Sequence, residues 1–178
     1  RMPEGDSFSL AECLGYLGRL CLDGGDLDEA ERLIEQSAAM TRRLSESAGS
    51  SFAGALLALG AVDASALRFS QALRHYEDAH DLYLEIHGTD DVFMVELCRL
   101  EIAGLLEDAA AVGDGLMSDI PEPRGSFNAS FVEAIQMRNR ARILLRAGAV
   151  DAAFRLIDAS IAVDEVDEVD GGHVERET

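Results

Sequence analysis

A pattern of apolar and small residues recurs along this chain at a spacing of 42 residues. A shift by that distance aligns Leu17 and Gly18 with Leu59 and Gly60. The same shift aligns three more positions in type, namely Ala30 with Ala72, Ile34 with Tyr76 and Ser37 with Ala79. A fixed period of this length indicates an array of equivalent units that bury their apolar faces against one another.

A third copy of the pattern lies near the end of the chain. Its members are Ala141, Leu144, Gly148, Asp151, Ala153, Ile157 and Ser160, with the spacing of Gly18, Cys21, Gly25, Asp28, Ala30, Ile34 and Ser37. The distance from Ala72 to Ala153 is close to two periods. One further unit is therefore expected between them, with residues 97–106 as its first helix.

The composition predicts an all-α fold. Hydrophobic residues make up 48% of the 178 residues, aromatic residues only 6%, and Trp is absent. A chain of this length can bury about two-thirds of its unfolded surface, and Ala- and Leu-rich packing suits helices better than strands. We expect about seven helices, near residues 8–23, 27–46, 51–66, 69–87, 91–111, 128–147 and 150–164.

The unit at residues 14–34 resembles the tetratricopeptide repeat. It has a Leu-Gly pair in its first helix, a Gly-Asp turn at Gly25, and small and large residues in its second helix. The long period, with the segment 87–95 before the third unit, is similar to the kinesin-light-chain type of repeat. The resemblance covers roughly residues 8–165 and implies an α-solenoid of antiparallel helix pairs, a superhelix whose first helices line a concave groove. We place this domain at residues 1–165.

The chain also departs from the family pattern. Leu14 and Leu56 stand where the family has Trp, and the turn of the second unit reads Leu67-Arg68-Phe69. Prolines and glycines predict a loop at 113–126 in place of a second helix in the third unit. The acidic segment 166–178 is expected to be a flexible tail.

Helix ends are marked by capping residues. Asp26, Ser50, Asp90 and Asn128 lie close to predicted starts, where a side-chain oxygen accepts hydrogen bonds from free amides. Gly24, Gly88 and Gly148 lie close to predicted ends.

The formal net charge of −19 disfavours binding to nucleic acids or anionic membranes. No apolar run approaches the roughly 20 residues that span a bilayer, and no signal peptide opens the chain. We expect a soluble, cytoplasmic protein. Its three cysteines, Cys13, Cys21 and Cys98, are expected to be reduced core residues.

No motif for catalysis is present in the sequence: it has no phosphate-binding loop, nucleophile elbow or zinc-protease motif. His75, His80 and His87 lie on or next to one helix, but without a converging cysteine or carboxylate they do not define a zinc site. We therefore expect a protein that is not an enzyme and has no metal or cofactor.

Four arginines lie in the predicted helix 128–147, against the overall charge: Arg138, Arg140, Arg142 and Arg146. Arg138, Arg142 and Arg146 are four residues apart and form a stripe about 12 Å long. One interpretation is that the stripe binds an acidic peptide, because guanidinium groups suit carboxylates. The other is internal pairing with Glu101, Glu107 or Asp108.

The resemblance implies that the concave groove binds a peptide or helix of a partner protein. The residues we assign to that groove are Arg138, Arg142, Arg146, Arg19, Leu57, Ala61 and Leu105, with Glu12 and Ala64 at neighbouring positions. Phe69, Tyr76, Tyr83 and Phe93 are expected to pack between units. The expected function is a non-catalytic interaction module or scaffold; the alternatives are an architectural or oligomerisation subunit and a regulatory domain of a longer signalling protein.

Overall fold

A computed structural model describes residues 7–44, 49–89, 93–120 and 130–171 of the chain. Within these ranges the chain forms seven α-helices and no strand, which confirms the all-α prediction. The helices are α1 (Phe8–Gly24), α2 (Leu27–Arg43), α3 (Gly49–Ser65), α4 (Phe69–His87), α5 (Phe93–Ala111), α6 (Ser130–Arg146) and α7 (Val150–Gly171). The largest difference from the predicted ranges is in α7, which continues to Gly171 and so includes the start of the expected tail.

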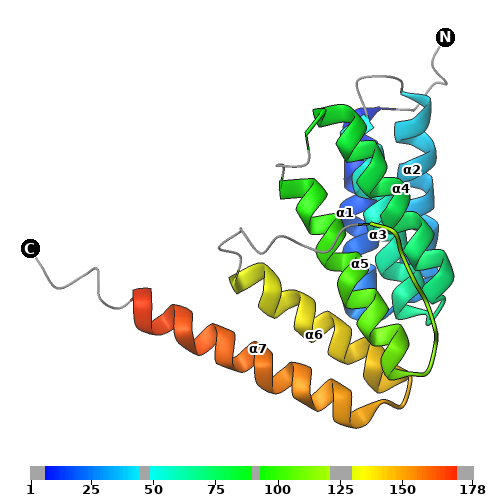
Figure 1. Cartoon of the computed structure of the whole chain (residues 1–178). Helices are drawn as coiled ribbons and strands as arrows, with labels where there is room; N and C mark the ends of the chain where they lie inside the picture. Colours follow the sequence, from blue (N-terminus) through cyan, green and yellow to red (C-terminus); the bar gives the residue numbers. More distant parts are fainter. Residues whose placement is uncertain (1–6, 45–48, 90–92, 121–129, 172–178) are drawn as a thin grey trace, which may run out of the picture.

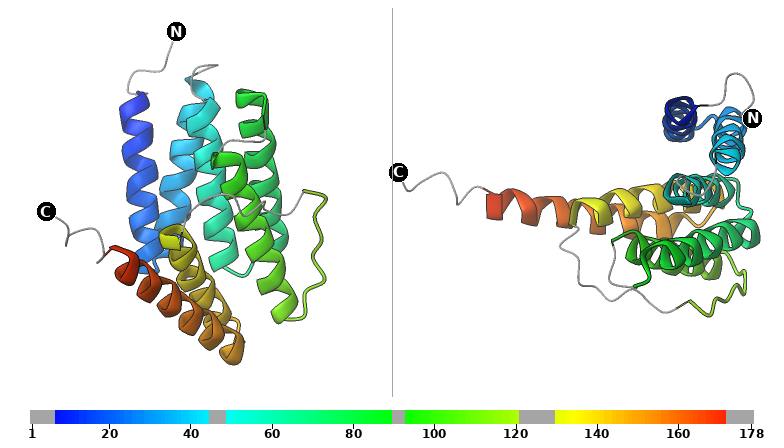
Figure 2. Two further views of the ribbon diagram at one scale, coloured as in Figure 1. Left: turned by 60° about the vertical axis from the view of Figure 1, so that its left-hand side comes forward. Right: turned by 90° about the horizontal axis from the view of Figure 1, so that it is seen from above.

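The helices α1 to α5 lie side by side in chain order, and each packs against the next (Figure 1). The α6–α7 hairpin runs at an angle across the C-terminal ends of α1, α3 and α5 (Figure 2). Helix α7 extends past the row. The largest core cluster lies between α3, α4 and α5 and includes Phe69, Tyr76 and Ile102. The hairpin has its own cluster around Ala141, Leu144 and Ala153.

The 42-residue period seen in the sequence corresponds to equivalent helix contacts. A Cβ atom on Gly18 would lie 2.5 Å from Ile34, and one on Gly60 would lie 2.4 Å from Tyr76. In both of these units, the large side chain of the second helix packs directly against the glycine of the first helix. Small residues on the second helices are equally buried, with Ala30, Ala72 and Ala153 all at 0% exposure. Close approach of the two helices explains why these positions hold small residues.

Four helices, α1, α3, α5 and α6, end in the same hydrogen-bonded turn. Two amides after each helix bond back to carbonyls five and three residues earlier, and the turn residue has positive φ. That residue is Gly25, Leu67, Gly113 or Gly148. Gly24, Gly88 and Gly148 lie close to helix ends as predicted: Gly24 is the last residue of α1 and is followed by the cap Gly25.

Side-chain caps begin the first two helices. The predicted cap Asp26 accepts a hydrogen bond from the Glu29 amide at 3.2 Å, and Ser7, which we did not predict, accepts one from Leu10 at 3.1 Å. Ser50 is the second residue of α3 and does not precede it. The predicted caps Asp90 and Asn128 lie outside the described residues.

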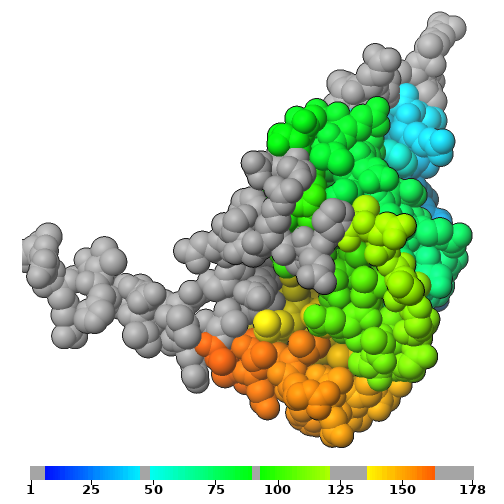
Figure 3. All heavy atoms as spheres, viewed as in Figure 1, coloured from blue at the N-terminus to red at the C-terminus, as the bar shows by residue number. Residues whose placement is uncertain are grey.

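The described part of the predicted loop, residues 113–120, contains no helix, whereas its remaining residues lie outside the described ones. After α5 the segment 112–120 runs in an irregular path, and Leu116 and Ile120 pack against the main core cluster. The Ser118 hydroxyl donates a hydrogen bond to Glu77 on α4. Figure 3 shows the surface formed by this segment, in yellow-green, beside α4 and α5. The segment therefore covers part of the core that a second helix would cover.

Two expectations about the core are wrong. Phe93, the first residue of α5, is 41% exposed, whereas Phe69, Tyr76 and Tyr83 are buried as predicted. Cys13 is exposed on α1 because the outer face of the first helix has no neighbour within the described residues. Cys98 is buried as expected, and burial raises the pKa of its thiol to about 12.

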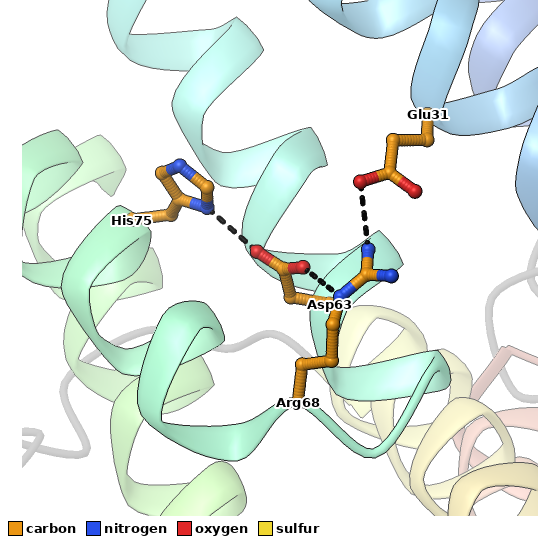
Figure 4. Close-up of polar contacts among 4 residues, drawn as sticks. All are labelled: Glu31, Asp63, Arg68 and His75. Carbon is orange, nitrogen blue, oxygen red and sulfur yellow. Dashed lines mark hydrogen bonds and ion pairs between the residues drawn. The ribbon is translucent and has the colours of Figure 1, made fainter.

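A polar network ties the second unit to the first (Figure 4). The buried carboxylate of Asp63 accepts hydrogen bonds from Arg68 Nε at 2.6 Å and forms a 2.8 Å contact with His75 Nδ1. Arg68 also pairs with Glu31 on α2 at 2.9 Å. The hydrogen bond from Asp63 raises the pKa of the Arg68 guanidinium. The network holds the α3–α4 turn in place although the turn residue is not glycine.

Replacing Leu67 by glycine is expected to give a more stable protein than replacing it by alanine. Leu67 has φ +61°, which strains a residue with a Cβ atom. Both substitutions remove the partly buried leucine side chain, which is 39% exposed, but only glycine removes the Cβ atom. The free energy of unfolding of Leu67→Gly is therefore expected to exceed that of Leu67→Ala by about 0.5–1 kcal/mol. Chemical denaturation measures the difference, and equal stabilities of the two variants would contradict the explanation.

Candidate binding groove

A hollow of about 160 Å³ lies where α1, α3, α5 and α6 converge. Its apolar floor comes mainly from α3, through Leu57, Ala58 and Ala61. Apart from Asp63 and the serines at its ends, α3 consists of apolar and small residues, so the middle of its groove-facing side is apolar. The other lining residues are Arg19, Leu22, Asp23, Ser65, Tyr76, Leu97, Glu101, Gln136, Asn139, Arg140, Arg142 and Ile143.

A second hollow of about 170 Å³ continues from the first along α1 and α3. Arg19 and Ala58 line both, so together they form one path, which we call the concave groove. The second hollow is lined by Glu12, Gly15, Tyr16, Arg19, Ile34, Ser37, Thr41, Ser51, Gly54, Ala55 and Ala58. Small residues on α3 leave the room that the groove occupies.

Three charged side chains that line the groove, Glu12, Arg19 and Glu101, form no direct ion pair within the described residues. Arg19 is exposed between the two hollows and makes no hydrogen bond there. Glu101 on α5 accepts a hydrogen bond from Gln136 Nε2 at 2.9 Å, and burial raises the pKa of its carboxyl group. The groove therefore presents a cation and two carboxyl groups to anything that enters it.

Two of the three stripe arginines bind the ends of neighbouring helices. Arg142 donates to the Asp23 carbonyl of α1 at 3.0 Å, and Arg146 donates to the Ser65 carbonyl of α3 at 3.0 Å. Asp23 and Ser65 are 42 residues apart, so the two carbonyls occupy equivalent positions in successive units. The turn motif leaves these carbonyls without a helical partner, and a helix C-terminus attracts cations.

Contacts within the protein therefore involve two of the three arginines in the stripe, Arg142 and Arg146. Arg142 also bonds to Asn139 Oδ1 at 2.6 Å and lines the groove, whereas Arg146 does not line it. Arg138 is exposed and lines a further hollow between α6 and α7, which shares Asn139 and Arg142 with the concave groove. The three side chains do not converge on one ligand site.

Arg140 makes the internal pair that the second interpretation of the arginines predicted. Its guanidinium donates to Asp108 Oδ1 at 2.9 Å and to Glu107 Oε2 at 2.7 Å, and its aliphatic stem lies over Gly104 of α5. The sequence did not show which arginine makes this pair. The signal that could have selected Arg140 is its position off the stripe, on the helix face toward α5.

Some of the predicted groove residues line the groove and others are buried in the core. Arg19, Leu57 and Ala61 line the concave groove, as does Glu12 at its far end. Leu105 and Ala64 are 4% and 2% exposed in the main core cluster and do not reach the groove. They lie on the sides of α5 and α3 that face the core.

The histidines have structural surroundings. His75 contacts Asp63, His87 stacks on Tyr83 with ring centroids 6.3 Å apart, and buried His80 contacts Asp81 at 3.0 Å. The part of the chain that the structure describes contains no group of three or more residues that could hold a metal ion. None of the described helices is both long and apolar enough to cross a membrane.

Comparison with protein-family models and with curated proteins gave no match.

Proposed function

We propose that this protein is a non-catalytic interaction module of the tetratricopeptide-like α-solenoid type, which binds a segment of another protein in the concave groove. The equivalent Gly18–Ile34 and Gly60–Tyr76 contacts and the shared turn of α1, α3, α5 and α6 support the repeat architecture. In such an array the first helices line the concave side.

The observation that carries the proposal is the shape and lining of the groove. Each hollow, at about 160 and 170 Å³, is smaller than the roughly 300–1,000 Å³ typical of small-molecule sites. Two small hollows joined along one path suit successive side chains of a peptide or helix. Apolar anchors would lie on Leu57, Ala58 and Ala61, and a carboxylate of the partner would pair with Arg19.

Selection of peptides from a random display library tests the proposal. Ala61→Trp fills the groove floor, and Ala39→Trp places the same side chain on the exposed side of α2 as a matched control. Peptides selected on the unaltered protein should bind the Ala39→Trp variant normally and the Ala61→Trp variant at least about tenfold more weakly. Circular dichroism and melting temperature verify that both variants are folded. Equal binding to the two variants would show that the peptides do not bind in the concave groove.

A specific observation favours a second candidate function, that of an architectural subunit. Large apolar side chains are exposed on the first and last helices, outside the lining of the concave groove: Leu17 and Leu20 on α1 are 51% and 66% exposed, and Phe154 on α7 is 57% exposed. Exposed apolar patches of this kind mark interaction sites in soluble proteins.

A further inference from the structure

Helix α1 exposes a side that α3 and α5 cover. Leu17 lies eight residues before the turn residue Gly25, and 51% of its surface is exposed. Leu59 and Leu105 lie eight residues before the turn residues of α3 and α5. Leu59 packs against the buried residues of α2, and Leu105 packs in the main core cluster with residues of α4. A first helix thus uses this side to pack against the second helix that precedes it in the chain.

Helix α1 has no such neighbour on this side. Leu20 is 66% exposed, whereas its counterpart on α3, Val62, is 1% exposed and packs against α2. Cys13 is exposed as well. No helix precedes α1 among the described residues. We call Cys13, Leu17 and Leu20 the α1 face.

Helix α7 exposes a side that α2 and α4 cover. In the repeat, Phe154 and Ile161 of α7 correspond to Leu73 and His80 of α4. The two residues of α4 are 6% and 3% exposed, and Leu73 packs in the main core cluster with residues of α5. Ala38, the counterpart of Ile161 on α2, is 7% exposed. Phe154 and Ile161 are 57% and 49% exposed, and we call them the α7 face.

The α1 face and the α7 face are the two halves of a contact that occurs twice within the chain. A second helix packs against the next first helix where α2 meets α3 and where α4 meets α5. The face of α1 is equivalent to the covered faces of α3 and α5, and that of α7 to the covered faces of α2 and α4. The α7 face of one molecule therefore fits the α1 face of another. Neither face contains a charged residue, so the net charge of −19 places no like charges within the faces themselves.

We propose that copies of this chain associate head to tail, with the α1 face of one copy packed against the α7 face of the next. The contact repeats the packing of α3 on α2 and of α5 on α4, so α1 continues the array of the neighbouring copy. Such an interface is heterologous, because it joins two different faces. Association therefore proceeds beyond two copies or closes into a ring. The proposal does not rest on the binding of a partner in the concave groove.

Sedimentation velocity of the full chain over a range of concentrations tests the proposal. We expect the unaltered protein to form dimers and larger species as its concentration rises. Leu17→Glu with Leu20→Glu places two charges on the α1 face, and Phe154→Glu with Ile161→Glu does the same on the α7 face. Each double substitution should weaken association at least about tenfold, because burial of an unpaired charge is unfavourable.

An equimolar mixture of the two double variants distinguishes this interface from others. Each variant retains one intact face, so the α7 face of one can bind the α1 face of the other. The mixture should form a dimer that does not grow further, although neither variant associates alone. The control Gln36→Glu with Ala39→Glu adds the same charge at exposed positions of α2 and should associate like the unaltered protein.

Three results would overturn the proposal. One is a strictly monomeric unaltered protein at its highest soluble concentration. The second is an α7-face variant that associates as strongly as the unaltered protein, which would indicate that α1 faces pair with each other. The third is an equimolar mixture that stays monomeric. Leu20→Glu and Phe154→Glu alone, each at a position more than half exposed, keep the test valid if a double variant unfolds.

Discussion

Replacing Arg140 by methionine is expected to lower the free energy of unfolding by about 3 kcal/mol. The guanidinium of Arg140 is the partner of Asp108, whose side chain is only 2% exposed. Methionine keeps much of the stem that packs over Gly104 but leaves the buried carboxylate without its cation. Chemical denaturation at neutral pH measures the loss.

The pH dependence of that loss has a defined sign. Burial raises the pKa of Asp108 even with Arg140 present, and removal of Arg140 raises it further. The deficit of the Arg140→Met variant should therefore be largest above the folded-state pKa of Asp108. It should shrink as the pH falls, since protonation removes the unpaired charge.

A matched control is Arg155→Met on α7, where the arginine is exposed. It should change the stability by less than about 0.5 kcal/mol. Combining Arg140→Met with Asp108→Asn should recover part of the loss, because no buried charge remains. A loss below about 1 kcal/mol for Arg140→Met alone would show that α6 is not fastened to α5 by this pair.

Replacing Gly60 by alanine is expected to lower the free energy of unfolding by about 2–3 kcal/mol. The new Cβ atom would lie 2.4 Å from the ring of Tyr76, which is 3% exposed and held within the main core. Helices α3 and α4 would have to move apart, since the ring has no free space to enter. Thermal and chemical denaturation measure the change.

The same substitution at Gly54 provides the control on the same helix. There the nearest atom, the Tyr83 hydroxyl oxygen, would be 3.5 Å from the Cβ, which is an ordinary contact. Alanine favours a helix over glycine by up to about 1 kcal/mol, so Gly54→Ala should be neutral or stabilising. The steric account predicts opposite signs for Gly54 and Gly60, and the same sign at both would contradict it.

The sequence was most informative where the repeat was regular. Gly18, Gly60, Ala30 and Ala72 predicted close helix contacts at a fixed period, and those contacts are present. Local patterns also predicted six helices within a few residues of their bounds. The exception is α7, which continues past residue 164 to Gly171, although acidic residues had suggested a tail.

Contacts between distant elements could not be predicted in this way. The spacing of Arg138, Arg142 and Arg146 shows that they share a face of a helix, but it does not show what lies opposite. Because the α6–α7 hairpin crosses the row of helices, Arg142 and Arg146 meet the carbonyls of Asp23 and Ser65. A regular stack would have placed α6 alongside α5, so the predicted groove residues were chosen for a different arrangement.

The central claim is that the concave groove binds a segment of another protein, and methyl NMR tests it most directly. A peptide selected on the unaltered protein would be titrated into a sample with labelled alanine and leucine methyl groups. The account predicts that the signals of Leu57, Ala58 and Ala61 shift with one common affinity, while Ala39 on α2 does not change. Shifts confined to α7 or to the outer face of α1, with Leu57, Ala58 and Ala61 unchanged, would contradict it.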